Sequence, residues 1–215
     1  MTARLAAVLW DMDGTLIDSE PIWIAQQFVL AERHGGTWSY EQGLALVGAD
    51  MHDTALAMQA AGVEMEASEL VAALERGVID SLRSEVPWRP GVRERLAELV
   101  REGIPCAIAT TSSHEMAALV AAAAPDGAIS VVVGSEDVTQ TKPSPEPYLR
   151  AAELLGVRAV DCVAVEDSPN GLAAAIASGA TTIAVPNDAV LPESGDFLLW
   201  PTLEGRTVED FRECF

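Results

Sequence analysis

The stretch LAAVLWDMDGTLIDSEP, residues Leu5 to Pro21, begins as a continuous apolar run and turns acidic at Asp11 and Asp13. A continuous run of this kind is typical of a strand that is buried on both faces of a parallel sheet. Two carboxylates separated by one residue repel each other, and burial strengthens that repulsion. The pattern therefore predicts that a positive group neutralises the pair at the end of this strand.

Four further apolar runs have the same character as the first, which covers residues 6–10. They lie at residues 106–109, 129–133, 162–165 and 182–185. Helical patterns separate these later runs, such as the apolar stripe from Val92 to Val100 that stops at Gly103. The sequence S-S-H-E at residues 112–115 predicts a capping box, and Ser168 before Pro169 predicts a helix N-cap. Alternating strands and helices predict an α/β fold with a doubly wound parallel sheet.

The interval between the first two strands is unusually long, at roughly ninety residues instead of a short crossover. Within it the patterns are all helical, including an amphipathic segment from Ile22 to His34 and a capping box from Ser39 to Gln42. Pro87, Pro90 and Gly91 mark the return to the sheet. We therefore expect a core of residues 1–17 and 87–215, and an inserted all-helical domain at 18–86.

The chain is strongly acidic, with 33 Asp and Glu residues against 13 Lys and Arg residues and a formal net charge of −20. Such a surface repels nucleic acid and anionic lipid, so neither is an expected partner. No cluster of basic residues reverses the field locally. An anionic substrate would therefore need a dedicated positive site.

The cysteines Cys106, Cys162 and Cys214 are odd in number and form no C-x-x-C pair, so neither a disulfide framework nor a zinc knuckle is indicated. Cys106 and Cys162 lie in apolar runs and are expected in the core. This usage fits a reducing cytosol. No signal peptide or membrane span is recognisable. We therefore expect a cytoplasmic protein. No heptad pattern or apolar patch points to a dimer, so we expect a monomer.

Polar residues follow each of the first four strands. Asp11 and Asp13 follow the first, Thr110 to Ser112 the second, Lys142 the third after a loop, and Glu166 with Asp167 the fourth. Ligands of a doubly wound sheet bind outside the carboxyl ends of its strands. The four sets are therefore expected to converge on one edge of the sheet.

These residue types together suit phosphoryl transfer. Asp11, Asp13 and Asp167 offer oxygen ligands to a hard cation such as Mg²⁺. Lys142 adds a compact positive charge for an anion, and Thr110 precedes a helix whose N-terminal amides suit phosphate. Each piece alone has a structural explanation, as a turn, a helix cap or a surface residue. Their recurrence in order after successive strands favours the functional interpretation.

The motifs DMDGTLIDSEP, IATTSS, TKPSPEPYL and VEDSPNG resemble the four motifs of the haloacid dehalogenase superfamily, most closely its β-phosphoglucomutase-like and phosphosugar phosphatase branch. The resemblance spans nearly the whole core. It implies a Rossmann-like core with a helical cap inserted after the first motif. It also implies Mg²⁺ as the cofactor and a small phosphorylated metabolite as the substrate.

The resemblance further implies roles for the residues that follow the first strand. Asp11 would be the nucleophile that forms an aspartyl-phosphate. Asp13 would protonate the leaving alcohol and then activate water, while its backbone carbonyl would bind the metal. The dehalogenases of the superfamily lack this second acid, so its presence argues against dehalogenation.

Roles also follow for the three later motifs. Thr110 and the amide of Thr111 would hold the phosphoryl oxygens, and Lys142 would link nucleophile and phosphate. Asp167 would bind Mg²⁺ together with Asp11, and Glu166 would support that metal shell.

Three functions are compatible with these motifs: a phosphatase for a sugar or polyol phosphate, a phosphosugar mutase, and a non-catalytic phosphate binder. As aligned, β-phosphoglucomutase carries a His and a cap Arg at the positions of Trp23 and Met51. A mutase needs a cap cation for its bisphosphate intermediate, so both departures favour the phosphatase. A binder would be expected to have lost Asp11 or Asp13, and neither is lost. Gly48 is a candidate cap loop or helix stop.

Overall fold

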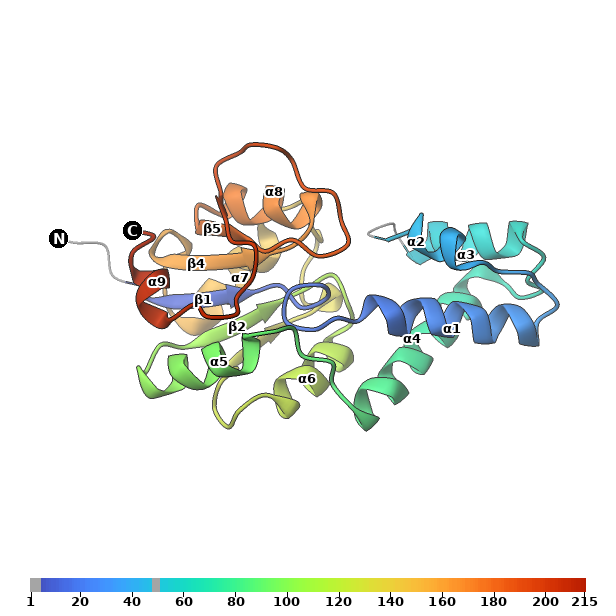
Figure 1. The fold of residues 1–215 in the computed structure, drawn as a ribbon, viewed down its shortest axis with the longest axis horizontal. Helices are drawn as coiled ribbons and strands as arrows, with labels where there is room; N and C mark the ends of the chain where they lie inside the picture. The colour runs from blue at the N-terminus through green and yellow to red at the C-terminus, as the bar shows by residue number, and fades with distance from the viewer. Residues whose placement is uncertain (1–4, 48–50) are drawn as a thin grey trace. The chain divides into compact units, whose positions relative to one another are not determined.

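The computed structural model describes residues 5–47 and 51–215, so Gly48 lies outside the described residues. Contacts between Cα atoms divide the chain into two compact units. The first unit combines Met1–Asp18 with Pro87–Phe215, and the second is Ser19–Val86. Figure 1 shows a mixed α/β architecture in the first unit and helices in the second.

The first unit is built on a parallel sheet, which confirms the predicted α/β fold class. Its strands run in the order β3-β2-β1-β4-β5-β6. Their bounds are β1 Ala7–Trp10, β2 Cys106–Ala109, β3 Val131–Val133, β4 Cys162–Glu166, β5 Thr181–Ala184 and β6 Leu198–Leu199. The chain leaves β1 toward β2 and β3 and returns to β4 on its other side, so the direction of winding reverses beside β1.

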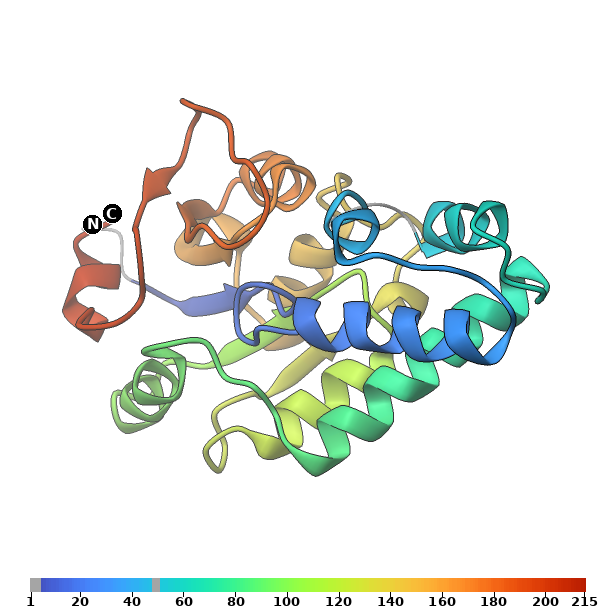
Figure 2. The same ribbon diagram turned by 45° about the vertical axis from the view of Figure 1, so that its right-hand side comes forward.

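Helices cover both faces of this sheet (Figures 1 and 2). Their bounds are α5 Val92–Arg101, α6 His114–Ala123, α7 Glu146–Leu155, α8 Pro169–Ser178 and α9 Val208–Arg212. On one face, α7 and α8 bury a cluster that includes Leu9, Ala109, Ala164 and Tyr148. In both views α5 and α6 lie on the opposite side from α8.

The C-terminal segment completes the sheet and one face of the core. Strand β6 pairs Leu198 with Ile183 of β5, and its two residues are exposed. A strand of two residues leaves no periodic signal, which is why no sequence pattern indicated it. Farther on, Phe211 of α9 packs edge-on against Trp10 and Trp200, with ring centroids 6.0 and 5.0 Å apart.

The second unit is helical throughout its described regular structure. Its helices are α1 Glu20–Arg33, α2 Tyr40–Leu44, α3 Met51–Ala60 and α4 Ala67–Ser84. Helix α4 packs against α1 and α3 around a small core that includes Leu30, Met58 and Leu74. The predicted capping box at Ser39 is confirmed, since its hydroxyl accepts from the amide of Gln42. None of the described helices of either unit has the length and apolar content of a membrane span.

Candidate active site

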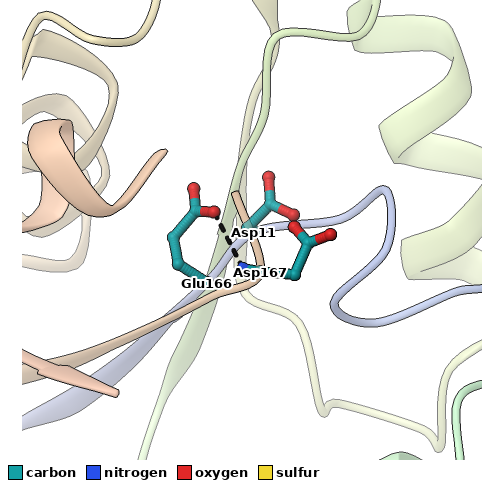
Figure 3. Close-up of side chains that lie close together, drawn as sticks. All are labelled: Asp11, Glu166 and Asp167. Carbon is teal, nitrogen blue, oxygen red and sulfur yellow. Dashed lines mark hydrogen bonds between the residues drawn. The ribbon is translucent and has the colours of Figure 1, made fainter. Parts of the chain in front are cut away.

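The carboxyl ends of β1 and β4 bring three acidic side chains together. Residues Trp10 and Val165 are paired across these strands, and the amide of Asp11 donates to the carbonyl of Val165 at 3.0 Å. Glu166 and Asp167 come next in the chain. Figure 3 shows the three carboxylates facing one another, and each contributes an oxygen within 4.8 Å of the others. The cluster is buried, so its negative charge needs compensation.

Lys142 supplies part of that compensation from the loop before α7. Its ammonium lies 2.6 Å from Asp11 Oδ1 and 2.6 Å from Glu166 Oε1, and its side chain is only 4% exposed. Burial alone would lower the pKa of Lys142, but the charges of Asp11 and Glu166 raise the pKa above its ordinary value. Lys142 is the only lysine in the sequence. The one ammonium side chain of the chain is therefore buried between two carboxylates.

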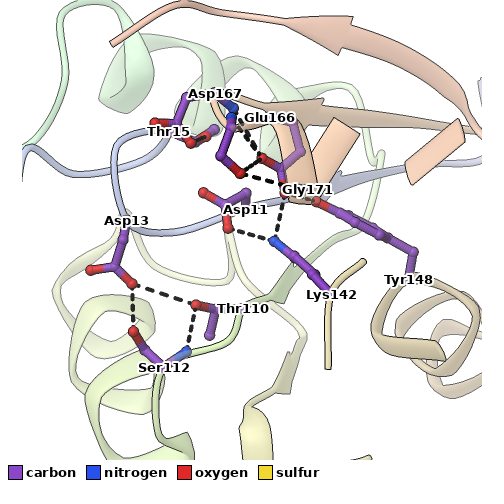
Figure 4. A network of polar contacts seen from close by, with 11 residues as sticks. Asp11, Asp13, Thr15, Thr110, Ser112, Lys142, Tyr148, Glu166, Asp167 and Gly171 are labelled. Carbon is purple, nitrogen blue, oxygen red and sulfur yellow. Dashed lines mark hydrogen bonds and ion pairs between the residues drawn. The ribbon is translucent and has the colours of Figure 1, made fainter. Parts of the chain in front are cut away.

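Glu166 is the most completely bonded member of the cluster (Figure 4). Its Oε1 accepts from Lys142 and from the hydroxyl of Tyr148 at 2.7 Å. Its Oε2 accepts from the amides of Asp167 and Ser168, at 3.0 and 3.3 Å, and from the Ser168 hydroxyl at 3.2 Å. The predicted cap of α8 is confirmed, since Ser168 Oγ accepts from the amide of Gly171. These donors hold Glu166 in one position.

Gly171 leaves the space that the Glu166 carboxylate occupies. A Cβ atom built on Gly171 would lie 1.8 Å from Glu166 Oε1. Alanine normally stabilises a helix by about 1 kcal/mol relative to glycine. Here we expect Gly171→Ala to destabilise the protein by about 2 kcal/mol, because overpacking outweighs helix propensity. Chemical denaturation measures the change, with Asn170→Ala at the exposed neighbouring position as the control. A stabilised Gly171→Ala variant would contradict the expected clash.

Asp13 lies apart from the lysine network and contacts the loop after β2. Its Oδ2 accepts from the hydroxyl of Ser112 at 2.6 Å and from that of Thr110 at 3.5 Å. The amide of Ser112 in turn donates to Thr110 Oγ1 at 3.0 Å. A pattern S-S-H-E at residues 112–115 would suggest a capping box, but α6 starts at His114 without a side-chain cap. Ser112 donates to Asp13 instead, and the neighbouring Thr111 is exposed.

A tight turn carries Asp13 past the end of β1. The amides of Leu16 and Ile17 both donate to the carbonyl of Met12, at 2.9 and 3.1 Å. Gly14 has a φ of 81°, and a Cβ there would lie 2.1 Å from Asp167 Oδ2, so only glycine fits. The Gly14 carbonyl accepts from Arg89 at 2.7 Å, and the same guanidinium reaches the Pro186 carbonyl at 3.0 Å. Arg89 thereby connects this turn to the loop that follows β5.

The surrounding side chains do not fully neutralise the negative charge of Asp11 and Asp167. Burial, followed by the charge of Glu166, raises the pKa of Asp11 from 3.8 to about 7. Burial, followed by the charge of Asp11, raises the pKa of Asp167 from 3.8 to about 9. Asp11 Oδ2 is buried without a hydrogen-bond partner among the described residues. An orphaned carboxylate oxygen in an all-oxygen donor set fits a hard divalent cation.

Every residue singled out in the sequence motifs lies at the carboxyl edge of the sheet. Lys142 joins Asp11 and Glu166, while Asp13 joins Thr110, so the residues form two neighbouring groups (Figure 4). Sequence reasoning missed the polar contacts of Tyr148, Ser112 and Arg89. Arg89 carried no signal. Tyr148 lies within the motif TKPSPEPYL, but a tyrosine on an apolar helix face is expected in the core, and Ser112 lies within IATTSS but was assigned to a helix cap. The catalytic and metal-binding roles of the predicted residues remain predictions.

Fold and site define a class of protein: a doubly wound α/β enzyme with a carboxylate and lysine centre at its switch point. The family model for haloacid dehalogenase-like hydrolases matches residues 8–185 of the chain. The chain therefore belongs to the haloacid dehalogenase-like hydrolases, as the motifs indicated.

Relatives within this family include named phosphatases. Hexitol phosphatase A of Escherichia coli is 35% identical over 208 residues, which cover 95% of this chain and 94% of that protein. A probable pseudouridine-5'-phosphatase of Drosophila melanogaster is 30% identical over 88% of this chain and 85% of its own length. The crystal structure of CbbY from Rhodobacter sphaeroides with phosphate aligns with a TM-score of 0.83 and 25% identity. That alignment covers 95% of this chain and 98% of the CbbY chain.

Proposed function

We propose that this protein is a Mg²⁺-dependent phosphatase that hydrolyses a small sugar or polyol phosphate through an aspartyl-phosphate intermediate. The observation that carries the proposal is the state of Asp11. One of its oxygens is held by Lys142 at 2.6 Å, and the other is buried without a partner among the described residues. A carboxylate fixed at one oxygen and bare at the other is arranged to bind a cation and to attack phosphorus.

Asp11 and Asp167, with the backbone carbonyl of Asp13, would hold the Mg²⁺ ion. When bound, the ion would neutralise the carboxylates and the negative charge of the phosphoryl oxygens. Glu166 supports this set without being free to join it, because both of its oxygens already accept hydrogen bonds from Lys142, Tyr148 and the start of α8.

In the first half-reaction, an oxygen of Asp11 attacks the phosphorus of the ester. The bond between phosphorus and the ester oxygen breaks as Asp13 gives its proton to that oxygen, so the alcohol leaves neutral. Lys142 holds the attacking carboxylate and offers positive charge to the phosphoryl group. Thr110 and the amide of Thr111 donate to the phosphoryl oxygens as negative charge spreads over them.

In the second half-reaction, Asp13 takes a proton from water, and that water oxygen attacks phosphorus. The bond between phosphorus and the Asp11 oxygen breaks, which releases inorganic phosphate and regenerates the Asp11 carboxylate. One residue is thus the acid first and the base second. The contact of Ser112 with Asp13, at 2.6 Å, supports this residue beside the phosphate donors.

Replacing Asp13 by asparagine should lower kcat by about 10²- to 10⁴-fold, because it removes the proton donor and then the base. Asparagine preserves the side-chain shape, so the hydrogen bond from Ser112 can be kept and the fold retained. Phosphate release from a hexitol phosphate measures the loss. A kcat within about twofold of the parent protein would contradict the assigned role.

Binding of Mg²⁺ should raise the midpoint of thermal unfolding, and the rise should be larger at about pH 8 than at about pH 5. The pKa values of Asp11 and Asp167 are raised on folding, to about 7 and about 9. Between about pH 4 and about pH 9, these two groups therefore hold protons in the metal-free folded protein that the unfolded chain has already released. Their contribution to stability must fall as the pH rises through this window.

A cation that binds the deprotonated carboxylates offsets this loss, which makes its stabilising effect grow with pH. Thermal denaturation with Mg²⁺ and with a chelator measures the difference at each pH. Asp167→Asn is the matched variant, and it should lose most of the response. Equal Mg²⁺ shifts in Asp167→Asn and the parent protein would show that the ion binds elsewhere.

A hexitol or related polyol phosphate is the first substrate to test. Hexitol phosphatase A is similar to this chain over nearly the full length of both proteins. CbbY of Rhodobacter sphaeroides, seen with xylulose-(1,5)bisphosphate, shares the fold with a TM-score of 0.82. We further propose that residues 18–86 act as the cap and that the enzyme works as a cytoplasmic monomer. Light scattering of the purified protein tests the monomer.

Nothing in the described structure favours the mutase alternative. Trp23 and Met51 pack against the apolar core of the second unit, in the cluster around Leu30 and Met58. Neither side chain offers a charge to a second phosphate. A mutase would convert a sugar phosphate into its isomer without net phosphate release, so product analysis separates the two activities.

A further inference from the structure

We propose that Tyr148 is a positioning residue of the phosphoryl-transfer site, which holds Glu166 so that Lys142 stays shared with Asp11. The inference rests on the proposed function and gives a role to a residue that takes no part in the two half-reactions.

Tyr148 and Lys142 bind the same oxygen atom of Glu166. Tyr148 donates its hydroxyl to Glu166 Oε1 at 2.7 Å, and Lys142 Nζ lies 2.6 Å from the same oxygen. The Lys142 ammonium also lies 5.0 Å from the centroid of the Tyr148 ring. Tyr148 therefore touches both partners of the ion pair, through its hydroxyl and through its ring face (Figure 4).

Packing alone does not require a hydroxyl group at this position. Tyr148 is fully buried in the apolar cluster between α7, α8 and the sheet, where phenylalanine would fill nearly the same volume. A buried hydroxyl costs stability unless it is hydrogen-bonded. Burial and the charge of Glu166 raise the pKa of Tyr148 well above 10, so the phenol keeps its proton and acts as a donor.

The role of the Tyr148 hydroxyl follows from the way in which Asp11 and Glu166 share Lys142. Lys142 lies between two carboxylates, at 2.6 Å from each, and both compete for its charge. The Tyr148 hydroxyl donates a second hydrogen bond to Glu166 Oε1 and so partly stabilises this carboxylate without adding charge. Without it, Glu166 Oε1 would depend on Lys142 alone and would draw the ammonium away from Asp11. The attacking carboxylate would then be less well fixed, and the phosphoryl group would meet less positive charge.

Tyr148→Phe removes only the hydroxyl and keeps the ring, and Tyr40→Phe is its matched control. Tyr40 is the only other tyrosine and is 55% exposed in the second unit. Because Lys142 is the only lysine, protein labelled with ¹³C and ¹⁵N lysine and carrying no lysine in its tag gives one lysine side-chain signal. This NMR signal should shift in Tyr148→Phe and stay unchanged in Tyr40→Phe.

The kinetic expectation is a fall in kcat of about tenfold in Tyr148→Phe, with KM within about twofold, because positioning affects the chemical step more than binding. In a Glu166→Gln background, Tyr148→Phe should change kcat by less than about twofold, since the two residues act as one unit. A purely structural role would instead give additive losses in the double variant.

Two results would overturn the inference: an unshifted lysine signal with unchanged kcat, or full additivity with Glu166→Gln. The test is separable from that of the proposed function. If the parent protein releases no phosphate from any ester, the phosphatase proposal fails, while the lysine signal still reports whether the Tyr148 hydroxyl governs the contacts of Lys142.

Discussion

Replacing Asp11 by asparagine should reduce phosphate release by at least about 10⁴-fold, because it removes the nucleophile of the proposed mechanism. The loss should appear in kcat, with no phosphoenzyme trapped on acid quenching. Lys142 keeps its ion pair with Glu166 in this variant, so the loss is not one of architecture. Steady-state release of phosphate from a hexitol phosphate, with Mg²⁺ present, measures the effect.

The same variant should be at least as stable as the parent protein in the absence of metal. Burial and the charge of Glu166 oppose ionisation of Asp11, and asparagine removes that repulsion. Asp126→Asn, at an exposed position of the same unit, is the control and should change neither stability nor activity. Near-normal turnover by Asp11→Asn would show that another group attacks the phosphorus.

Replacing Lys142 by methionine should destabilise the protein by about 3–5 kcal/mol near neutral pH and abolish turnover. The ammonium is bonded to two carboxylates that are 9% and 0% exposed, and methionine removes its positive charge from both, which leaves Glu166 with its neutral donors only. The two side chains have similar length, so the loss reports charge and hydrogen bonding more than volume. Chemical denaturation gives the change in the free energy of unfolding.

The pH dependence of this variant distinguishes its cause. Lowering the pH protonates Asp11, whose pKa is already raised, and so removes one uncompensated charge. The stability difference between Lys142→Met and the parent protein should therefore shrink at about pH 5. Arg93→Met, at an exposed position of α5, removes a positive charge from the surface and should show neither effect. A pH-independent difference would point to packing as the cause.

Most of the sheet was predictable because its strands are buried on both faces. The apolar runs at 106–109 and 162–165 match β2 and β4, with β4 extending one residue farther to Glu166. Strand β3 is shorter than the predicted run and begins at Val131. Strand β6 could not be foreseen, because its two exposed residues depend on pairing with β5 rather than on their own pattern.

The charged residues of the site could be predicted from the sequence, whereas the neutral residues that hydrogen-bond to them could not. Asp11, Lys142 and Asp167 stand out because carboxylates and an ammonium are unusual beside buried strands. The polar role of Tyr148 could not be identified, although the residue lies in the motif TKPSPEPYL, since a tyrosine on an apolar helix face is expected in the core. The position of Ser112 is also typical of a helix cap, and only the spatial position of Asp13 decides which partner its hydroxyl binds.

Phosphorus NMR of the purified protein with Mg²⁺ and a mixture of hexitol, hexose, pentose and triose phosphates tests the central claim most directly. The experiment follows every ester and inorganic phosphate together, with Asp11→Asn as the inactive control. We predict that one ester signal shrinks while inorganic phosphate grows, and that neither changes with Asp11→Asn. A new ester signal without inorganic phosphate would contradict the proposed phosphatase and identify a mutase.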